Sequence, residues 1–275
     1  MIKKVSDYIA DFLVTNGIKD MFTVTGGGAM HLNDSFGHKK ELNCIYNHHE
    51  QACSIAAEGY TRLTNKLAGV CVTTGPGGTN AITGVYGAYV DSIPMFIISG
   101  QVKRQTTVYC NNIELRQLGD QEINIIDIVK SITKYSVMIT KPEEIRYHLE
   151  KAMYLALNGR PGPVWLDIPI DVQAAKIETD DLSGFDAHEE GIDIKETPVY
   201  DENITKEIIA KIKDAKRPVI LAGTGIRVAG YKNKFIKLIE NLNVPLLTAW
   251  NAHDLIDNEH PLFVRKTWYS WNKRR

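Results

Sequence analysis

The sequence lacks the features that identify membrane, nucleic-acid-binding and disulfide-bonded proteins. No apolar run is long enough to span a bilayer, so we expect no transmembrane segment. The four cysteines form no C-x-x-C pair and have no metal-ligand spacing, which favours free thiols in a reducing, cytoplasmic setting and no metal site. The formal net charge of −1 gives no electrostatic case for nucleic acid or an anionic membrane surface. We therefore expect neither as a partner.

The first residues also lack the unbroken apolar core of a signal peptide. Asp7 and Asp11 interrupt residues 1–17, and the apolar side chains around them recur at helical spacing. This pattern predicts an amphipathic helix.

Glycine-rich turns are present, but the usual phosphate-binding signatures are absent. Residues 75–80, Gly-Pro-Gly-Gly-Thr-Asn, stand between an apolar run and a predicted helix, and a helix N-terminus can bind phosphate. The turn has neither the G-x-G-x-x-G spacing of a dinucleotide site nor the Lys-Ser/Thr of a P-loop. A generic nucleotide-binding α/β module is therefore the least favoured function.

Apolar strands alternate with amphipathic helices through residues 1–177. Runs such as 67–73 and 95–99 are too apolar to alternate, which is typical of strands buried on both faces. The predicted fold class is α/β, a doubly wound parallel sheet. We expect strands at 21–24, 42–46, 67–73, 95–99 and 164–169, four or five of them buried, and helices at 1–17, 31–36, 47–63, 81–88 and 142–157.

The composition changes after residue 177. Residues 178–202 contain ten acidic residues and one basic residue, which predicts a solvated acidic linker. Residues 203–264 resume the α/β pattern as an incomplete second domain, and its unfinished sheet is expected to expose an apolar edge near 244–247. Residues 265–275 carry five basic residues, no acids and two tryptophans, and we expect this basic tail to be aberrant. In the second domain we expect helices at 204–214 and 231–242 and strands at 218–222 and 244–247.

The helix beginning at residue 47 carries the first candidate for chemistry. Its apolar positions recur at three- and four-residue intervals, which predicts one buried stripe formed by Ala52, Ile55, Ala56, Tyr60 and Leu63. Glu50 stands in the first turn, where the helix macrodipole stabilises an anion. It also follows strand 42–46, and open α/β sheets bind ligands at the carboxyl ends of their strands. The alternative is an ordinary first-turn glutamate.

A second glycine-rich turn, Thr-Gly-Gly-Gly-Ala at residues 25–29, joins strand 21–24 to the next helix. Three glycines let the backbone approach a flat or bulky partner without a Cβ in the way. A tight connection with no further role explains the spacing equally well.

Two stretches share a pattern with one enzyme family. The first is His49-Glu50-Gln51 followed by Ala57-Glu58-Gly59-Tyr60 and Arg62, and the second is Thr74-Gly75-Pro76-Gly77 with Asn80, then residues 91–95. Together they resemble thiamine-diphosphate-dependent enzymes of the acetolactate synthase type. The resemblance implies that Glu50 is catalytic, because the family's glutamate hydrogen-bonds the aminopyrimidine ring of the cofactor and drives the tautomer that strips the thiazolium proton. The cofactor-binding residues that it implies are Gly27, Gly28, Ala29, Glu50, Thr74, Gly75, Pro76, Gly77 and Asn80.

A polar run beyond these stretches provides the second catalytic candidate. Residues 103–119 have no clean period, which suits a loop over an active site. The family has a Phe-Gln-Glu run next, its glutamine facing the substrate-derived intermediate, and Gln121 and Glu122 match that run. Asp120 replaces the phenylalanine, so a wall that is apolar in the family is charged here. A surface-loop position is the alternative for Gln121.

The resemblance implies an enzyme that decarboxylates a 2-keto acid such as pyruvate on thiamine diphosphate and transfers the carbanion to a carbonyl acceptor, as a transferase or lyase. It also implies a homodimer or tetramer in the full-length enzyme, and Mg²⁺ bound through a diphosphate-binding domain that is missing from this sequence. FAD is not expected, because Gly223-Thr224-Gly225 is more typical of a plain strand-to-helix turn. We expect the resemblance to end near Val264, as in a chain truncated by a frameshift, and the chain alone to be inactive.

A non-catalytic role is the alternative function. A pyrimidine-domain chain of this kind would act only by pairing with a separate diphosphate-binding subunit, as in split members of the superfamily.

Overall fold

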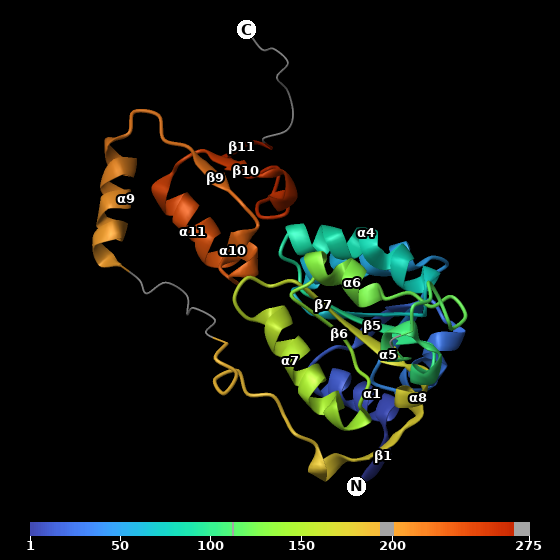
Figure 1. Cartoon of the computed structure of the whole chain (residues 1–275). Helices are drawn as coiled ribbons and strands as arrows, with labels where there is room; N and C mark the ends of the chain where they lie inside the picture. The colour runs from blue at the N-terminus through green and yellow to red at the C-terminus, as the bar shows by residue number, and fades with distance from the viewer. Residues whose placement is uncertain (112, 193–200, 267–275) are drawn as a thin grey trace. The chain divides into compact units, whose positions relative to one another are not determined.

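The structure is a computed structural model that describes residues 1–111, 113–192 and 201–266. The chain divides into two compact units, residues 1–196 and 197–275 (Figure 1). Each unit is described by itself below. Within the described ranges, no helix is long and apolar enough to cross a bilayer.

The first unit is built on a six-stranded sheet with the strand order β3-β2-β4-β5-β7-β6, and every neighbouring pair is parallel. This confirms the predicted doubly wound parallel sheet. The strands are β2 (Asp20–Thr23), β3 (Asn43–Tyr46), β4 (Ala68–Val72), β5 (Met95–Gln101), β6 (Tyr135–Met138) and β7 (Pro163–Pro169). Strand β6 was not predicted, because it lies at the edge and is only partly buried.

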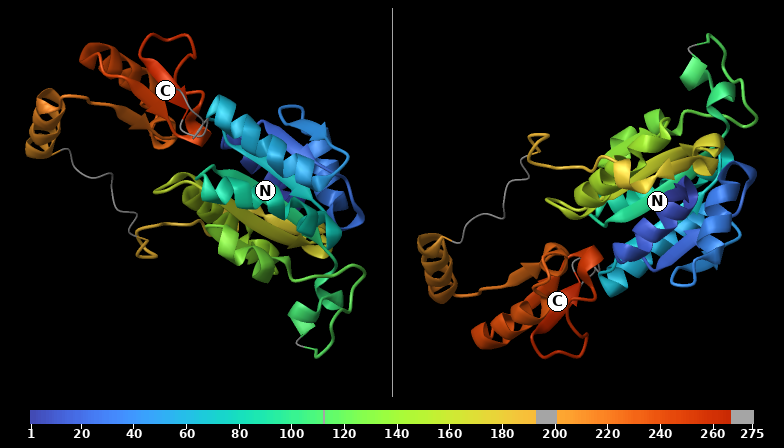
Figure 2. Two further views of the ribbon diagram at one scale, coloured as in Figure 1. Left: turned by 90° about the horizontal axis from the view of Figure 1, so that it is seen from above. Right: turned by 90° about the horizontal axis from the view of Figure 1, so that it is seen from below.

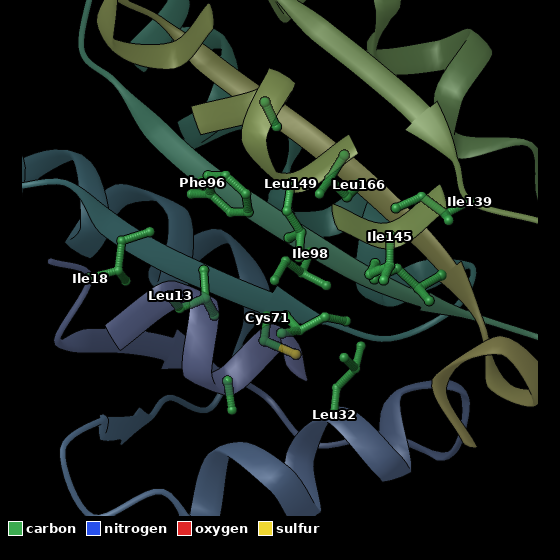
Figure 3. Close-up of a cluster of buried hydrophobic side chains, with 14 of the residues drawn as sticks. Leu13, Ile18, Leu32, Cys71, Phe96, Ile98, Ile139, Ile145, Leu149 and Leu166 are labelled. Carbon is green, nitrogen blue, oxygen red and sulfur yellow. The ribbon is translucent and has the colours of Figure 1, made fainter. Parts of the chain in front are cut away.

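Helices cover both faces of this sheet, because successive side chains of a strand point to opposite sides. Phe96 and Ile98 pack on the face covered by α1 (Val5–Thr15), α2 (Met30–His38), α7 (Ile145–Leu157) and α8 (Ile170–Ala174) (Figure 3). Met95 and Ile97 pack on the other face, which is covered by α3 (Glu50–Thr64), α4 (Pro76–Val90) and α6 (Ile125–Val129). Every residue of β4, β5 and β7 is buried, which explains why their sequences are largely apolar; the buried polar exceptions are Ser99 and Gln101 on β5 and Asp167 on β7.

Short elements complete the first unit. Strand β1 (Ile2–Lys4) pairs antiparallel with β8 (Lys176–Glu178). Figure 2 shows the segment that carries α5 (Val108–Asn111) projecting from the body of the unit. The 3₁₀ turns are η1 (Gly27–Ala29), η2 (Arg104–Thr106), η3 (Lys130–Ile132), η4 (Pro142–Glu144) and η5 (Thr179–Asp181).

Two local expectations about the first unit were wrong. Strand β3 was expected to be buried, but it is an edge strand, and within the described part of the chain it pairs only with β2. Helix α3 was expected to bury its large apolar stripe, but Ile55 is 48% exposed and Leu63 is 85% exposed. The buried side of α3 is formed by small residues, because these let α3 approach α4 closely, and they are Cys53, Ser54, Ala57 and Thr61.

The described part of the acidic segment after residue 177 is mostly exposed, but it packs on the first unit through two apolar residues. Leu182 is buried in the core of the first unit. The Phe185 ring packs against the rings of Tyr147 and Tyr154, with centroid distances of 5.9 and 5.6 Å. The acidic composition of the segment gave no indication that Leu182 and Phe185 pack on the first unit. Residues 193–200 lie outside the described residues.

The second unit has three parallel strands in the order β11-β10-β9. Its predicted helices and strands are present, but the apolar edge expected near 244–247 is not. Strand β10 is central, and Leu246 is fully buried. The first two residues of the predicted basic tail belong to β11, and residues 267–275 lie outside the described residues. The elements are α9 (Glu202–Asp214), β9 (Ile220–Ala222), α10 (Gly225–Val228), α11 (Lys232–Leu242), β10 (Leu246–Thr248), η6 (Trp250–Ala252) and β11 (Phe263–Lys266).

Candidate active site

The strand order places the two glycine-rich turns side by side. From β2 the chain moves to β3 on one side, and it then returns to form β4 on the other side of β2. The turns that leave β2 and β4 therefore diverge at a topological switch point, where open α/β sheets bind ligands. The Gly28 amide donates to the Thr73 hydroxyl over 3.1 Å, which joins the two turns directly.

Glu50 stands in the first turn of its helix, as predicted, but α3 begins at Glu50 itself and not at residue 47. His49 caps the helix, because its Nδ1 accepts the Gln51 amide over 3.1 Å. The Glu50 carboxylate is half-buried, and its Oε2 accepts a hydrogen bond of 3.0 Å from Nδ2 of Asn80 on α4. Among residues that the structure describes, none donates a hydrogen bond to the other oxygen, Oε1. The site therefore holds a carboxylate with one anchored and one available oxygen.

Asn80 contacts Glu50 from the first turns of α4, a helix that begins earlier than predicted. The glycine-rich turn was expected to precede a helix at residue 81, but the helix starts at Pro76. Proline at the first position of a helix is favourable, since its missing N–H would have no partner there. Gly75 precedes the helix with φ +61°, a left-handed conformation that favours glycine.

The glycines of the two turns have different roles. A Cβ on Gly26 or Gly28 would overlap the side chains of Thr73 and Thr74, so these two glycines permit loop-on-loop packing. A Cβ on Gly27 would meet nothing within 4 Å. At Gly26 and Gly28 the missing Cβ therefore permits close packing within the protein, in line with the tight connection that was one of the two explanations of this turn.

Gln121 lies against the glycine-rich turn at residues 75–80. A Cβ on Gly75 would lie 2.2 Å from the Gln121 carbonyl oxygen, so the two backbones touch. Gln121 adopts φ +55°, which is uncommon for a residue with a side chain, and it is exposed, as is Asp120. The structure thus brings both catalytic candidates, Glu50 and Gln121, to the turn at residues 75–77.

Glu122 holds the irregular segment together. Its Oε1 accepts the Val108 amide over 2.5 Å, and its Oε2 accepts the amides of Leu118 and Gly119 over 3.0 and 3.1 Å. Three backbone donors converge on one carboxylate, so the segment returns to the sheet as a closed loop. The family-matched glutamate is therefore structural here.

The remaining matched residues of α3 join it to α4. The Arg62 guanidinium pairs with Glu58 one turn away and with Asp91 at the end of α4. Nearer the site, a Cβ on Gly84 would lie 2.3 Å from the Ser54 hydroxyl oxygen and 2.7 Å from the Ile55 nitrogen. The two helices consequently run in close contact, which sets the distance between Glu50 and Asn80.

Three further predicted site residues lie at different depths in the first unit. Ala29 is fully buried in the core on the α1 side of the sheet. Thr74 is buried, and its hydroxyl donates to the Gly100 carbonyl over 3.1 Å. Pro76 is exposed at the first turn of α4.

Gln173 was missed by the sequence reasoning. Its side-chain amide is buried and donates to the carbonyls of Gly28 and Ile168, each over 2.7 Å. It supports the glycine-rich turn at residues 25–29 from α8. A polar residue inside a short apolar helix was the only signal, and it does not indicate what the side chain contacts.

Two family models match successive parts of the chain. The family model for the N-terminal TPP binding domain of thiamine pyrophosphate enzymes matches residues 3–128. The model for their central domain matches residues 205–272 and thus continues beyond Val264, where the resemblance was expected to end.

Relatives named acetolactate synthase align along most of the chain. The probable acetolactate synthase large subunit of Methanocaldococcus jannaschii is 34% identical over 268 residues, which cover 94% of this chain and 42% of the relative. The acetolactate synthase large subunit of Lactococcus lactis is 32% identical over 89% of this chain and 40% of its own length. The chain therefore spans about two fifths of the length of these relatives. With the N-terminal and central domain models matched in the family's own order, the chain belongs to the thiamine pyrophosphate enzyme family and is similar to acetolactate synthase large subunits.

Proposed function

We propose that this chain provides the pyrimidine-binding side of a thiamine diphosphate site in an acetolactate synthase-like enzyme. The observation that carries the proposal is the Glu50 carboxylate, which Asn80 anchors through Oε2 while Oε1 has no donor among the described residues. A carboxylate in the first turn of a helix, beside a topological switch point, is suited to accept a proton from a bound ring.

The surrounding residues fit an aromatic ring with N–H donors. A Cβ on Gly77 would lie in ordinary contact, 3.7 Å from Oε1 of Glu50, so this glycine borders the available oxygen. Gly27 leaves open space on the facing turn. Glu50, Asn80, Gly27 and Gly77 would hold the aminopyrimidine end of the cofactor.

Thiamine diphosphate, when bound, supplies the electron sink for decarboxylating a 2-keto acid such as pyruvate and for joining the remaining carbon unit to a carbonyl acceptor. In the proposed mechanism, Glu50 takes and returns a proton at Oε1 as a general acid and base. Asn80 holds the other carboxylate oxygen, so that Oε1 keeps one orientation. Gln121, on the backbone that touches Gly75, contributes an amide toward the substrate.

We propose that a second subunit covers the outer face of α3 and α4. Beside Glu50 and Asn80, this face exposes the large apolar side chains Ile55, Leu63, Tyr86, Tyr89 and Val90. Exposed apolar surface of this extent next to a site is typical of an interface. Relatives are named large subunits, which supports an oligomeric enzyme, and the partner would bring the Mg²⁺ and diphosphate contacts.

The substrate wall is proposed to differ from that of acetolactate synthases. Asp120 is exposed directly before Gln121 and carries a charge where an apolar ring is expected. It should disfavour anionic acceptors and tolerate polar ones such as hydroxylated aldehydes. Replacing Asp120 by Phe should shift acceptor preference toward pyruvate, and an unchanged acceptor profile would place Asp120 outside the substrate wall.

Proton exchange tests the role of Glu50. The full chain is titrated calorimetrically with thiamine diphosphate and Mg²⁺, alone and with a diphosphate-binding partner, and exchange of the thiazolium proton is followed by NMR. Glu50→Gln should lower the exchange rate about 10²- to 10⁴-fold while the fold survives. Glu41→Gln, an exposed glutamate in the loop before β3, is the matched control and should leave the rate unchanged.

The outcomes distinguish a catalytic role of Glu50 from a chain that acts only by pairing with a diphosphate-binding subunit. Retained exchange in Glu50→Gln would refute the catalytic assignment. Cofactor binding that requires a partner, with no turnover of pyruvate by the chain alone, would support the pairing of this chain with a diphosphate-binding subunit. Turnover by the chain alone would contradict it.

A further inference from the structure

A buried carboxyl group lies under the site without a role in the proposed mechanism. Asp167 is on β7 and is fully buried. Its neighbour on the same face of the strand, Trp165, packs in the core beneath α4 and α6. Among the described side chains, no Lys, Arg or His forms an ion pair with Asp167. A buried acid without a cation requires hydrogen bonds to be tolerated.

Two neighbours on β5 supply those hydrogen bonds. The Ser99 hydroxyl lies 2.5 Å from Oδ1 of Asp167, and it also accepts the Trp165 indole N–H over 2.8 Å. The Gln101 side-chain nitrogen donates to Oδ2 of Asp167 over 3.0 Å. The two carboxyl oxygens therefore have separate partners.

Gln101 links Asp167 to the Ile123 carbonyl. Its Oε1 accepts the Val102 amide over 3.0 Å, which sets the orientation of the side-chain amide. Its Nε2 then has two protons, and it donates one to Asp167 and the other to the Ile123 carbonyl over 3.1 Å. Both donors are used, so losing the acceptor on Asp167 would leave one Nε2 proton unpaired and remove one of the three hydrogen bonds that fix the Gln101 side chain.

The Ile123 carbonyl belongs to the turn that carries Gln121. Gln121 holds a left-handed conformation, and its carbonyl oxygen rests against Gly75. The contacts of Glu122 tie this turn to the 108–119 loop. The bond from Gln101 ties it to the sheet.

We propose that Asp167 is a positioning residue that acts through Gln101 to hold the turn carrying Gln121 at the active site. The inference rests on the proposed function only in assigning a substrate-facing role to Gln121. The hydrogen-bonded link itself is a property of the chain without cofactor.

The two oxygens of Asp167 determine what its variants should do: asparagine should mimic the protonated acid, and leucine should break both hydrogen bonds. Burial raises the pKa of Asp167 to about 7, and the bonds from Ser99 and Gln101 oppose that rise. A proton on Oδ1 can be donated to Ser99 while Oδ2 still accepts from Gln101. Asparagine can reproduce this arrangement, with its nitrogen toward Ser99 and its oxygen toward Gln101. Leucine has a similar shape but no acceptor.

Hydrogen exchange on the full chain without cofactor tests the link. The amides to follow are those of Gly119, Glu122 and Ile125, which are hydrogen-bonded within the turn. Their exchange is compared with that of β4 amides, which report unfolding of the whole sheet. Asp167→Leu and Gln101→Met should raise exchange in the turn about tenfold relative to β4, the size expected for one lost hydrogen bond. Asp167→Asn and Ser99→Ala should leave that ratio unchanged.

Either of two results would overturn the proposal. One is an unchanged ratio in Gln101→Met, which keeps Asp167 bonded to Ser99 and so tests the link even if Asp167→Leu does not fold. The other is a rise in Asp167→Asn as large as that in Gln101→Met. Because no cofactor is present, these results do not depend on the Glu50 assignment, and the Glu50 experiment does not depend on them.

Discussion

The contact between α3 and α4 predicts opposite effects for two Gly-to-Ala substitutions. A Cβ at Gly84 would lie 2.3 Å from the Ser54 hydroxyl oxygen and 2.7 Å from the Ile55 backbone nitrogen. A backbone atom cannot rotate away, so the helices must separate. A Cβ at Gly59, in the middle of α3, would meet nothing within 4 Å.

The magnitudes follow from packing and helix propensity. Overpacking destabilises by roughly 1–3 kcal/mol, and the contact with backbone places Gly84→Ala near the upper value. Alanine stabilises a helix by about 1 kcal/mol relative to glycine, which offsets part of the overpacking. We therefore expect Gly84→Ala to lower the free energy of unfolding by about 2 kcal/mol and Gly59→Ala to raise it by about 1 kcal/mol.

Separation of the helices should also reach the site. Asn80 and Glu50 lie one helical turn before Gly84 and Ser54. The Asn80–Glu50 hydrogen bond and the Gly84–Ser54 contact are therefore neighbouring contacts between α3 and α4. Gly84→Ala should therefore weaken the hydrogen bond between Asn80 and Glu50.

Urea denaturation measures both effects. Trp165 is fully buried in the first unit, and it reports unfolding of that unit once the other tryptophans are replaced by phenylalanine. Free energies are compared at equal m values, because a changed m indicates a different extent of unfolding. A Gly84→Ala protein as stable as the parent, or a Gly59→Ala protein less stable than the parent, would refute the packing argument.

Three further predictions concern charges and thiols. Arg62→Met should destabilise by about 1–3 kcal/mol, because Glu58 and Asp91 lose a shared cation, and Arg62→Lys should recover part of the loss in the same assay. The pKa of Asp167 is raised to about 7 in the folded protein and lies above its unfolded value, so the free energy of unfolding should fall as pH rises from about 4 to about 7. In Asp167→Asn this part of the pH dependence should be absent. A dependence of the unfolding free energy on pH that is the same in Asp167→Asn would contradict the raised pKa of Asp167. Exposed Cys110 should react with iodoacetamide under native conditions, whereas Cys71, buried with a pKa raised to about 12, should react only on unfolding, as mass spectrometry of digested protein can show.

Much of the fold could be predicted because the relevant signals are local. The apolar runs of β4 and β5 require burial on both faces, and strands of that kind imply helices on both sides of a parallel sheet. Glu50 could be placed at a helix start because the sequence before it ends a strand and the sequence after it has helical periodicity. Edge strand β6 and the packed segment at 178–192 were missed because their composition is mixed or polar.

The sequence by itself determined the alternation of strands and helices, the family pattern around Glu50, and the position of the glycine-rich turns. Only the tertiary structure decided which face of α3 is buried, because small residues at Ser54 and Gly84 allow close packing that outweighs the larger apolar stripe. It also decided that Asn80, thirty positions away, anchors Glu50, and that Gln101 connects Asp167 to the turn at Gln121. These contacts depend on strand order and register, which bring distant residues together without leaving a periodic signal in the chain.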